Sequence, residues 1–185
     1  MATNFQFNNK GYTLIEVLVA MSIFLTIIAA PTSFFVSSLK GQQKALASQE
    51  MIDNVSYIME YMSRALRMAK KDLTGTCIGQ NMNYENLIDT PGIKFLNYQD
   101  KCQKFFLEDE TLKESKDDVI NNLTPNDLEV VSFKIGLSGD ENPGDNKQPR
   151  VTLFLEVRGK RGQKTELQPE IKIQTTISQR NLDTF

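Results

Sequence analysis

A sharp change from polar to apolar residues near the N-terminus dominates the hydropathy pattern. A polar leader ends at Lys10-Gly11, and the apolar segment that follows carries a single acid, Glu16, close to its start. No charged residue occurs over 17–36, which is about the 20 apolar residues that a bilayer-spanning helix needs. A carboxylate carried toward the bilayer centre costs roughly 2.5 kcal/mol or more unless it finds a partner. Glu16 is therefore a candidate functional residue that requires a positive counterpart.

Beyond residue 40 the pattern becomes amphipathic. Apolar or small residues recur with a seven-residue spacing over 45–73, in two series offset by three. We expect one helix over about 13–72, bent near Pro31, because proline lacks the backbone donor that a helix needs. The apolar stripe requires cover, either from a second chain in a coiled coil or from a sheet of the same chain. Its members are Ala45, Ile52, Met59, Leu66 and Leu73 in one series and Ser48, Val55, Met62 and Ala69 in the other.

The C-terminal part of the chain alternates between apolar and polar residues, which predicts antiparallel strands with one apolar face each. In the strand expected over 128–137, the side chains of Val131, Phe133, Ile135 and Leu137 should share the apolar side. A helix followed by a sheet, in one layer each, predicts an α+β roll in which the long helix covers the sheet. The expected strands are 93–98, 103–107, 128–137, 151–157 and 171–177.

The composition restricts the chemistry that this chain can perform. It contains no histidine, so triads that use histidine and zinc sites with histidine ligands are excluded. An enzyme would need a pair of carboxylates, as in glycoside hydrolysis, and no acid lies in a recognisable motif. We therefore expect no enzymatic activity, no cofactor and no metal. The net charge of −2, mixed in sign, also argues against nucleic-acid contact.

Two cysteines, Cys77 and Cys102, are too few for a structural zinc site. Their even number fits one disulfide if the domain lies outside the cytoplasm, and a pair of unbridged thiols is the alternative. Two acidic stretches, 108–118 and 139–149, offer the oxygen ligands that calcium prefers. Neither has the ordered spacing of an EF-hand, so we interpret both as solvated loops.

The run Lys-Gly-Tyr-Thr-Leu-Ile-Glu-Val-Leu-Val-Ala at 10–20 resembles the N-terminal signature of type IV prepilins and pseudopilins. The resemblance implies that a dedicated peptidase cuts between Gly11 and Tyr12 and that the new Tyr12 N-terminus is methylated. It also implies that Glu16, then the fifth residue, pairs with the N-terminal amine of a neighbouring subunit. The amine of its own chain, one helical turn back, is the alternative partner. Tyr12 departs from the phenylalanine that is commonest there. Pro31 lies where the family often has a helix-bending proline.

The same resemblance implies an organisation for the whole chain. Residues 1–11 would be the leader, 12–40 the half of the helix that crosses the membrane and enters the filament core, and 41–185 the globular head. The head would combine the amphipathic half of the helix, 41–73, with a sheet domain over 74–185. The resulting fold is a pilin-like roll.

The implied function is that of a minor pilin or pseudopilin in a type IV pilus, a competence pseudopilus or a type II secretion pseudopilus. Its expected partners are other pilin-like subunits, the prepilin peptidase and methyltransferase, the inner-membrane assembly platform and the lipid bilayer. Before assembly the protein would be a single-pass inner-membrane protein with its head outside the cytoplasm. The alternative is a membrane-anchored extracytoplasmic binding domain that never polymerises.

Overall fold

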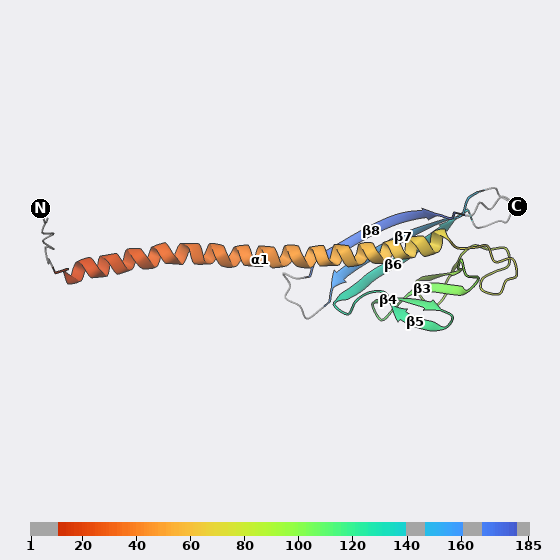
Figure 1. Ribbon diagram of the computed structural model, residues 1–185, viewed down its shortest axis with the longest axis horizontal. Helices are drawn as coiled ribbons and strands as arrows, with labels where there is room; N and C mark the ends of the chain where they lie inside the picture. Colours follow the sequence, from red (N-terminus) through yellow and green to blue (C-terminus); the bar gives the residue numbers. More distant parts are fainter. Residues whose placement is uncertain (1–10, 140–146, 161–167, 181–185) are drawn as a thin grey trace, which may run out of the picture. The chain divides into compact units, whose positions relative to one another are not determined.

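The computed structural model describes residues 11–139, 147–160 and 168–180, and the expected leader therefore lies almost wholly outside the described residues. Within these residues one helix precedes eight strands (Figure 1). The chain divides into two compact units, Met1–Gln43 and Lys44–Phe185, which we describe separately. The elements are α1 (Leu14–Arg67), β1 (Glu85–Asn86), β2 (Gly92–Leu96), β3 (Cys102–Glu108), β4 (Thr111–Lys116), β5 (Val119–Asn122), β6 (Leu128–Ser138), β7 (Arg150–Gly159) and β8 (Glu170–Ser178).

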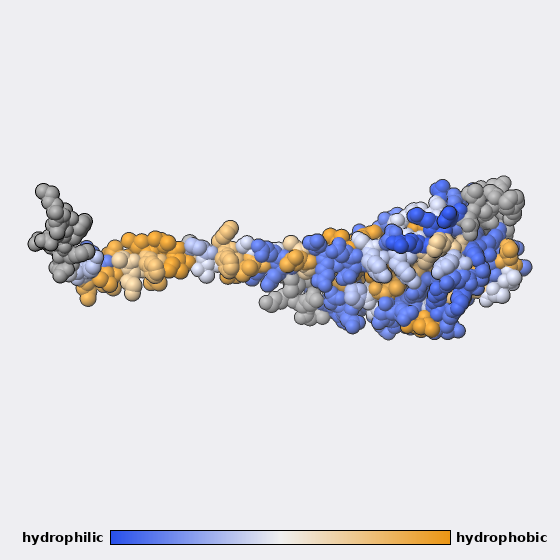
Figure 2. All heavy atoms as spheres, viewed as in Figure 1, coloured by the Kyte–Doolittle hydropathy of each residue, from blue (hydrophilic) through white to orange (hydrophobic). Residues whose placement is uncertain are grey.

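The first unit consists of the N-terminal part of α1, whose apolar side chains are exposed. Figure 2 shows hydrophobic residues gathered along this part of the helix. The helix is long and apolar enough to cross a membrane, and none of its most apolar window is buried within the protein. The helical assignment runs through Pro31 without interruption, so the proline is accommodated without the local melting that it could cause.

In the second unit, α1 ends at Arg67, earlier than the expected residue 72. The chain beyond the helix instead forms isolated bridges that pair Lys70 with Leu96 and Asp72 with Met82. The N–H of Lys70 donates to the carbonyl of Leu96 at 2.9 Å. These bridges satisfy backbone groups that a longer helix would have used, and Leu73, which was assigned to the apolar stripe, is exposed.

The residues of α1 that are buried agree only in part with the expected apolar stripe. Val55, Met59, Met62, Leu66 and Ala69 are buried as expected. Ala45 is exposed, Ile52 is 47% exposed, and Met51 and Ile58 lie in the core instead. The buried pairs Met51 and Ile58, and Val55 and Met62, are again seven residues apart. The seven-residue spacing therefore holds, and the buried face includes positions one residue earlier than one of the expected series.

Strands β6, β7 and β8 form an antiparallel sheet in that order, and its apolar face joins α1 in one core (Figure 1). The strands expected over 128–137, 151–157 and 171–177 are thus confirmed. The sheet side of the core includes Val130, Phe133, Val151, Leu153, Leu155, Val157 and Ile177. The predicted α+β fold, a long helix packed with an antiparallel sheet, is confirmed.

A β-bulge changes the apolar face of β6. The register with β7 shifts between Val130 and Ser132, so that Val130 is buried and Val131 is 44% exposed. The prediction that Val131 shares the inner side with Phe133 was wrong, because the extra residue of a bulge interrupts the strict alternation of side chains. Beyond the bulge, Phe133 faces the core as predicted.

The remaining strands form a second sheet, in the order β1-β2-β3-β4-β5, instead of extending the first. The strands expected over 93–98 and 103–107 correspond to β2 and β3. The stretch 108–118 is not an acidic loop, because it contains β4 and the turns on either side of it. Asp109, Glu110, Asp117 and Asp118 all have positive φ, the conformation required at both central positions of a type I′ hairpin turn. The acids therefore occupy turns of a meander.

Candidate functional site

The start of α1 is closed by a reciprocal cap between Thr13 and Glu16. The N–H and the hydroxyl of Thr13 donate to Oε2 of Glu16 at 3.2 and 3.1 Å. In return, the N–H of Glu16 lies 3.4 Å from the Thr13 hydroxyl. This is a capping box, which satisfies backbone donors that a helix N-terminus leaves free. The sequence segment Thr-Leu-Ile-Glu therefore fixes both the first residue of the helix and the position of its acid.

The cap leaves part of the Glu16 carboxylate available. Both Thr13 donors reach Oε2, and no described residue donates a hydrogen bond to Oε1. The preceding residues, Gly11 and Tyr12, lie outside the helix, and Tyr12 is 85% exposed. The site therefore presents one free acceptor oxygen beside an accessible peptide segment.

The described part of the chain does not require glycine at residue 11. A Cβ placed on Gly11 would meet no atom within 4 Å, and its backbone does not adopt the left-handed conformation that favours glycine. Gly41 is equally open, since a Cβ added there also meets nothing within 4 Å. The described residues would accept a side chain at either position, so they give no reason for glycine at residue 11.

The head is held together by a disulfide and by a buried carboxylate close to it. Cys77 and Cys102 form the disulfide, with their Cα atoms 5.3 Å apart. The two cysteines are therefore bridged and are not a pair of free thiols. Asp72 is fully buried and organises the loop that carries Cys77. Its Oδ1 accepts hydrogen bonds from Thr74 N, Thr74 Oγ1 and Gly75 N, and its Oδ2 accepts from Cys77 N at 2.7 Å and Ile78 N at 3.1 Å.

These hydrogen bonds determine the charge state of Asp72. Burial by itself raises the pKa of a carboxyl group. The backbone N–H groups of Cys77 and Ile78, with the donors of Thr74, outweigh that effect and hold the pKa of Asp72 well below its usual range. Asp72 is therefore a buried anion that serves as the centre of the loop. The sequence contained a signal for it, because Asp-x-Thr-Gly after a helix is typical of a side-chain-stabilised turn.

A second polar network joins α1 to the five-stranded sheet. The hydroxyl of Tyr61 donates to Oε1 of Glu114 at 2.8 Å, and the same oxygen accepts a hydrogen bond from Gln103 Nε2. Asn97 extends the network, because its Nδ2 donates a hydrogen bond to Gln103 Oε1 at 3.1 Å. Burial and the hydrogen bond to Glu114 raise the pKa of Tyr61, so its hydroxyl remains a donor. Sequence reasoning missed this network, because Glu114 lay in a stretch assigned to solvent.

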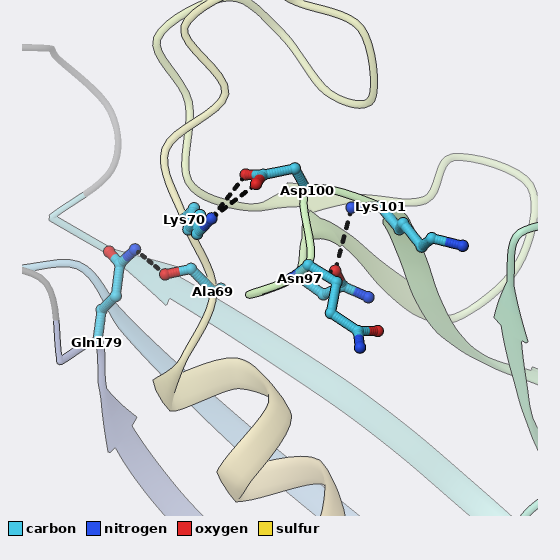
Figure 3. Close-up of polar contacts among 7 residues, drawn as sticks. Ala69, Lys70, Asn97, Asp100, Lys101 and Gln179 are labelled. Carbon is cyan, nitrogen blue, oxygen red and sulfur yellow. Dashed lines mark hydrogen bonds and ion pairs between the residues drawn. The ribbon is translucent and has the colours of Figure 1, made fainter.

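The chain that follows β8 closes the C-terminal end of α1 (Figure 3). Gln179 Nε2 donates to the carbonyl of Ala69 at 2.7 Å, and Arg180 N donates to the carbonyl of Arg67 at 2.8 Å. Nearby, Lys70 Nζ contacts both carboxylate oxygens of Asp100 at 2.8 Å. The Arg180 contact uses a carbonyl that the end of a helix leaves without a partner, and the Gln179 contact uses the carbonyl of Ala69, just beyond the helix.

Within the residues that the structure describes, no group of three acids or cysteines is placed to hold a metal ion. The acids of 108–118 are spread over β4 and two separate turns. The second acidic stretch, 139–149, lies mostly outside the described residues, because 140–146 are not among them.

Comparison with known proteins places the similarity at the N-terminus. The family model described as the prokaryotic N-terminal methylation motif matches residues 6–30. The pilin-like protein PilA3 of Thermus thermophilus is 35% identical over 60 residues, which cover 32% of this chain and 26% of PilA3. The matched region thus spans about a quarter of the length of that relative. No solved structure matches this chain.

Proposed function

We propose that this chain is a type IV pilin-family protein and acts as a minor pilin or pseudopilin; its N-terminal methylation motif and its similarity to a pilin-like protein support this. Its motif and its long apolar helix fit a membrane-anchored pilin that ends up in a pilus. The family is structural rather than catalytic. We propose further that a prepilin peptidase cuts between Gly11 and Tyr12, and that the new N-terminus is methylated.

The observation that carries this proposal is the open environment of Gly11. The described residues place no atom where a side chain on Gly11 would go, and Tyr12 beside it is exposed. A glycine that the fold does not need, next to an accessible peptide bond, is what a peptidase subsite with no room for a side chain would select. The requirement at residue 11 then belongs to the processing enzyme.

Glu16 has the geometry for a second role after the cut. The Thr13 cap occupies Oε2 and leaves Oε1 free, while cleavage creates a cationic amine on Tyr12. In an apolar surrounding, a bare carboxylate is far less stable than one that is paired with a cation. We therefore propose that Glu16 receives the Tyr12 amine of a neighbouring subunit, which would fix the axial register of packed helices.

The exposed apolar side chains of the first unit need cover, which lipid and then other subunits would provide. Large apolar residues from Leu14 to Leu39 are uncovered in the single chain. Lipid would cover them before assembly, and the helices of other pilin-like subunits, delivered by the inner-membrane assembly platform, would cover them afterwards. Burial of this surface supplies the favourable free energy for both states.

Mass spectrometry of the mature protein tests the proposal directly. We expect a chain that begins at a methylated Tyr12, and an intact Met1 would overturn it. The Gly11→Asp variant should accumulate unprocessed. Gly41→Asp is the matched control, because a side chain at Gly41 also meets open space. Normal processing of Gly11→Asp, or equal loss in both variants, would contradict a peptidase subsite at Gly11.

The pairing role of Glu16 is separable from processing. Glu16→Gln keeps the side-chain length and a carbonyl oxygen for the Thr13 cap, but it removes the charge. We expect normal membrane insertion and cleavage of this variant, with loss of incorporation into sedimentable filaments. Unchanged incorporation would remove the pairing role. A stable Met1 together with a tolerated Glu16→Ala would favour the anchored binding domain that does not polymerise.

A further inference from the structure

The first unit carries an apolar hollow on the side of α1 that contains Glu16. The hollow measures about 530 Å³, and the residues around it are exposed in the single chain. Figure 2 shows hydrophobic residues along this part of the helix. The residues that line the hollow are Tyr12, Glu16, Val17, Ala20, Met21 and Phe24.

The small side chain of Ala20 accounts for the hollow. Glu16, Ala20 and Phe24 follow one another at a spacing of four residues, which places them on one face of the helix about one turn apart. Alanine between two longer side chains leaves a notch in that face, and Val17 and Met21 line it as well. Positions 17, 20, 21 and 24 have the spacing i, i+3, i+4, i+7. Four residues so arranged can surround a hole that receives one side chain of a second helix.

The hollow combines apolar walls with one charge. Glu16 is the only charged residue among the six that line it. The Thr13 cap occupies Oε2 of Glu16, and within the described residues nothing donates a hydrogen bond to Oε1. The hollow therefore suits a group that has an apolar body and a cation, because an apolar group alone would leave the carboxylate unpaired in apolar surroundings.

The N-terminal residue that cleavage would create has both properties. A cut between Gly11 and Tyr12 leaves an aromatic ring and a cationic amine on the same residue. The Tyr12 of the same chain does not fill the hollow, because it forms one of the walls. The occupant therefore comes from another chain, and a second copy of this chain supplies the required ring and amine.

We propose that the hollow around Ala20 receives the Tyr12 ring of a second copy of this chain, while the amine of that residue pairs with Glu16. This inference rests on the cleavage and the pairing proposed above, and it adds the position of the ring and the identity of the neighbour. Aromatic residues that fill a pocket carry a large share of the binding free energy at protein interfaces. Two contacts from one residue also restrict the orientation of the second helix more than the charge pair alone.

Filling the notch tests the position of the ring. Ala20→Leu adds an isopropyl group at the centre of the hollow, and alanine and leucine are both strong helix formers, so the helix itself should be unaffected. We expect normal membrane insertion and a mature chain that begins at methylated Tyr12. Recovery of this variant in sedimentable filaments should fall about tenfold or more, because the added group overpacks the contact.

Ala29→Leu is the matched control. Ala29 is exposed on the same helix, nine residues after Ala20, and nine residues turn a helix about two and a half times. The two alanines therefore lie on opposite faces, and Ala29→Leu should enter filaments as the unmodified chain does. Normal incorporation of Ala20→Leu, or an equal loss in both variants, would overturn the hollow as the site of the ring.

A photo-cross-linking residue in the wall of the hollow identifies the occupant. p-Benzoylphenylalanine in place of Phe24 keeps an aromatic side chain there. In filaments assembled from a mixture of isotope-labelled and unlabelled full chains, illumination should join it to the peptide that begins with methylated Tyr12 of a different copy. Tandem mass spectrometry reads this product. The same probe at Ile15, nine residues earlier and on the opposite face, should not give it.

The outcomes separate this inference from the proposal on which it rests. A chain that begins at Met1, or that never enters filaments, would overturn both. Methylated Tyr12 and dependence on Glu16, together with a product at Phe24 that contains lipid or another protein, would keep the pairing role and overturn the second copy as the occupant. Equal yields of the Tyr12 product from the probes at Phe24 and Ile15 would have the same meaning.

Discussion

The hydroxyl of Tyr61 on α1 donates a hydrogen bond of 2.8 Å to the carboxylate of Glu114 on β4. The two residues lie far apart in the sequence, and the carboxylate is buried in the head. This bond therefore joins the helix to the five-stranded sheet at a largely buried carboxylate. Its strength should be visible in the stability of the head.

Tyr61→Phe should lower the free energy of unfolding by about 1.5–3 kcal/mol, since it removes a hydrogen bond to a buried charged group. Tyr57→Phe is the control, because Tyr57 lies on the same helix with its ring largely exposed and should change stability by less than about 0.5 kcal/mol. Urea unfolding followed by circular dichroism measures both. Equal effects in the two variants would mean that the contact with Glu114 contributes nothing.

Asp72 should make the stability of the head depend on acid. Its folded-state pKa is depressed, so its contribution is fully present above the ordinary unfolded value near 3.9 and is lost as the pH falls below about 4. Asp72→Asn replaces Oδ2 or Oδ1 by an NH₂ group that faces backbone donors, and should cost about 3 kcal/mol at neutral pH. Unfolding curves at pH 6 and pH 3 should differ less for this variant than for the unmodified chain. Asp100→Asn, at an exposed ion pair, should keep the full acid dependence.

Loss of the disulfide should destabilise the head by about 3–4 kcal/mol in the loop-entropy account, given a separation of 25 residues between the cysteines. Cys77→Ser combined with Cys102→Ser should show this in guanidinium unfolding. A reductant should shift the unmodified chain by a similar amount and leave the double variant unchanged. A shift of the double variant under reductant would point to an effect other than disulfide loss.

The bulge in β6 predicts opposite behaviour for adjacent valines. Val130→Ala should cost about 2 kcal/mol, because Val130 is buried in the core and its truncation leaves a cavity. Val131→Ala should change stability by less than about 0.5 kcal/mol. Thermal or chemical unfolding of the two variants, made in the same background, compares them. The reverse order of the two costs would contradict the bulge at this position.

The long-range features of this fold were predictable where one physical signal dominated. The uncharged stretch at 17–36 and the alternation in β7 and β8 each admit one interpretation, and the structure agrees with both. Val131 was misplaced because periodicity alone cannot reveal a bulge, whose position depends on pairing with β7. Ile52 was misplaced because its neighbour Met51 is also apolar, and hydropathy alone does not show which of the two adjacent side chains faces the core.

The acidic stretch 108–118 was misread for a different reason. Asp109-Glu110 and Asp117-Asp118 adopt the left-handed turn conformation, for which Asn-Gly or Asp-Gly is the usual sequence signal. The short strand between the two turns places Glu114 within hydrogen-bonding distance of Tyr61. Composition suggested solvent, whereas tertiary contacts with Tyr61 and Gln103 stabilise the strand. At the candidate site, the roles of Gly11 and Glu16 stay predictions that follow from the resemblance of the motif at 10–20. The cap from Thr13 became visible only with coordinates.

Arg180 attaches the chain after β8 to the last carbonyl of α1, Gln179 attaches it to Ala69 just beyond the helix, and Lys70 attaches the residues after α1 to the end of β2. A force applied to the C-terminal end of α1 would therefore be opposed by hydrogen bonds that lead to both sheets. A chain pulled by its helix would transmit the load to each sheet through these contacts, without relying on the apolar core alone.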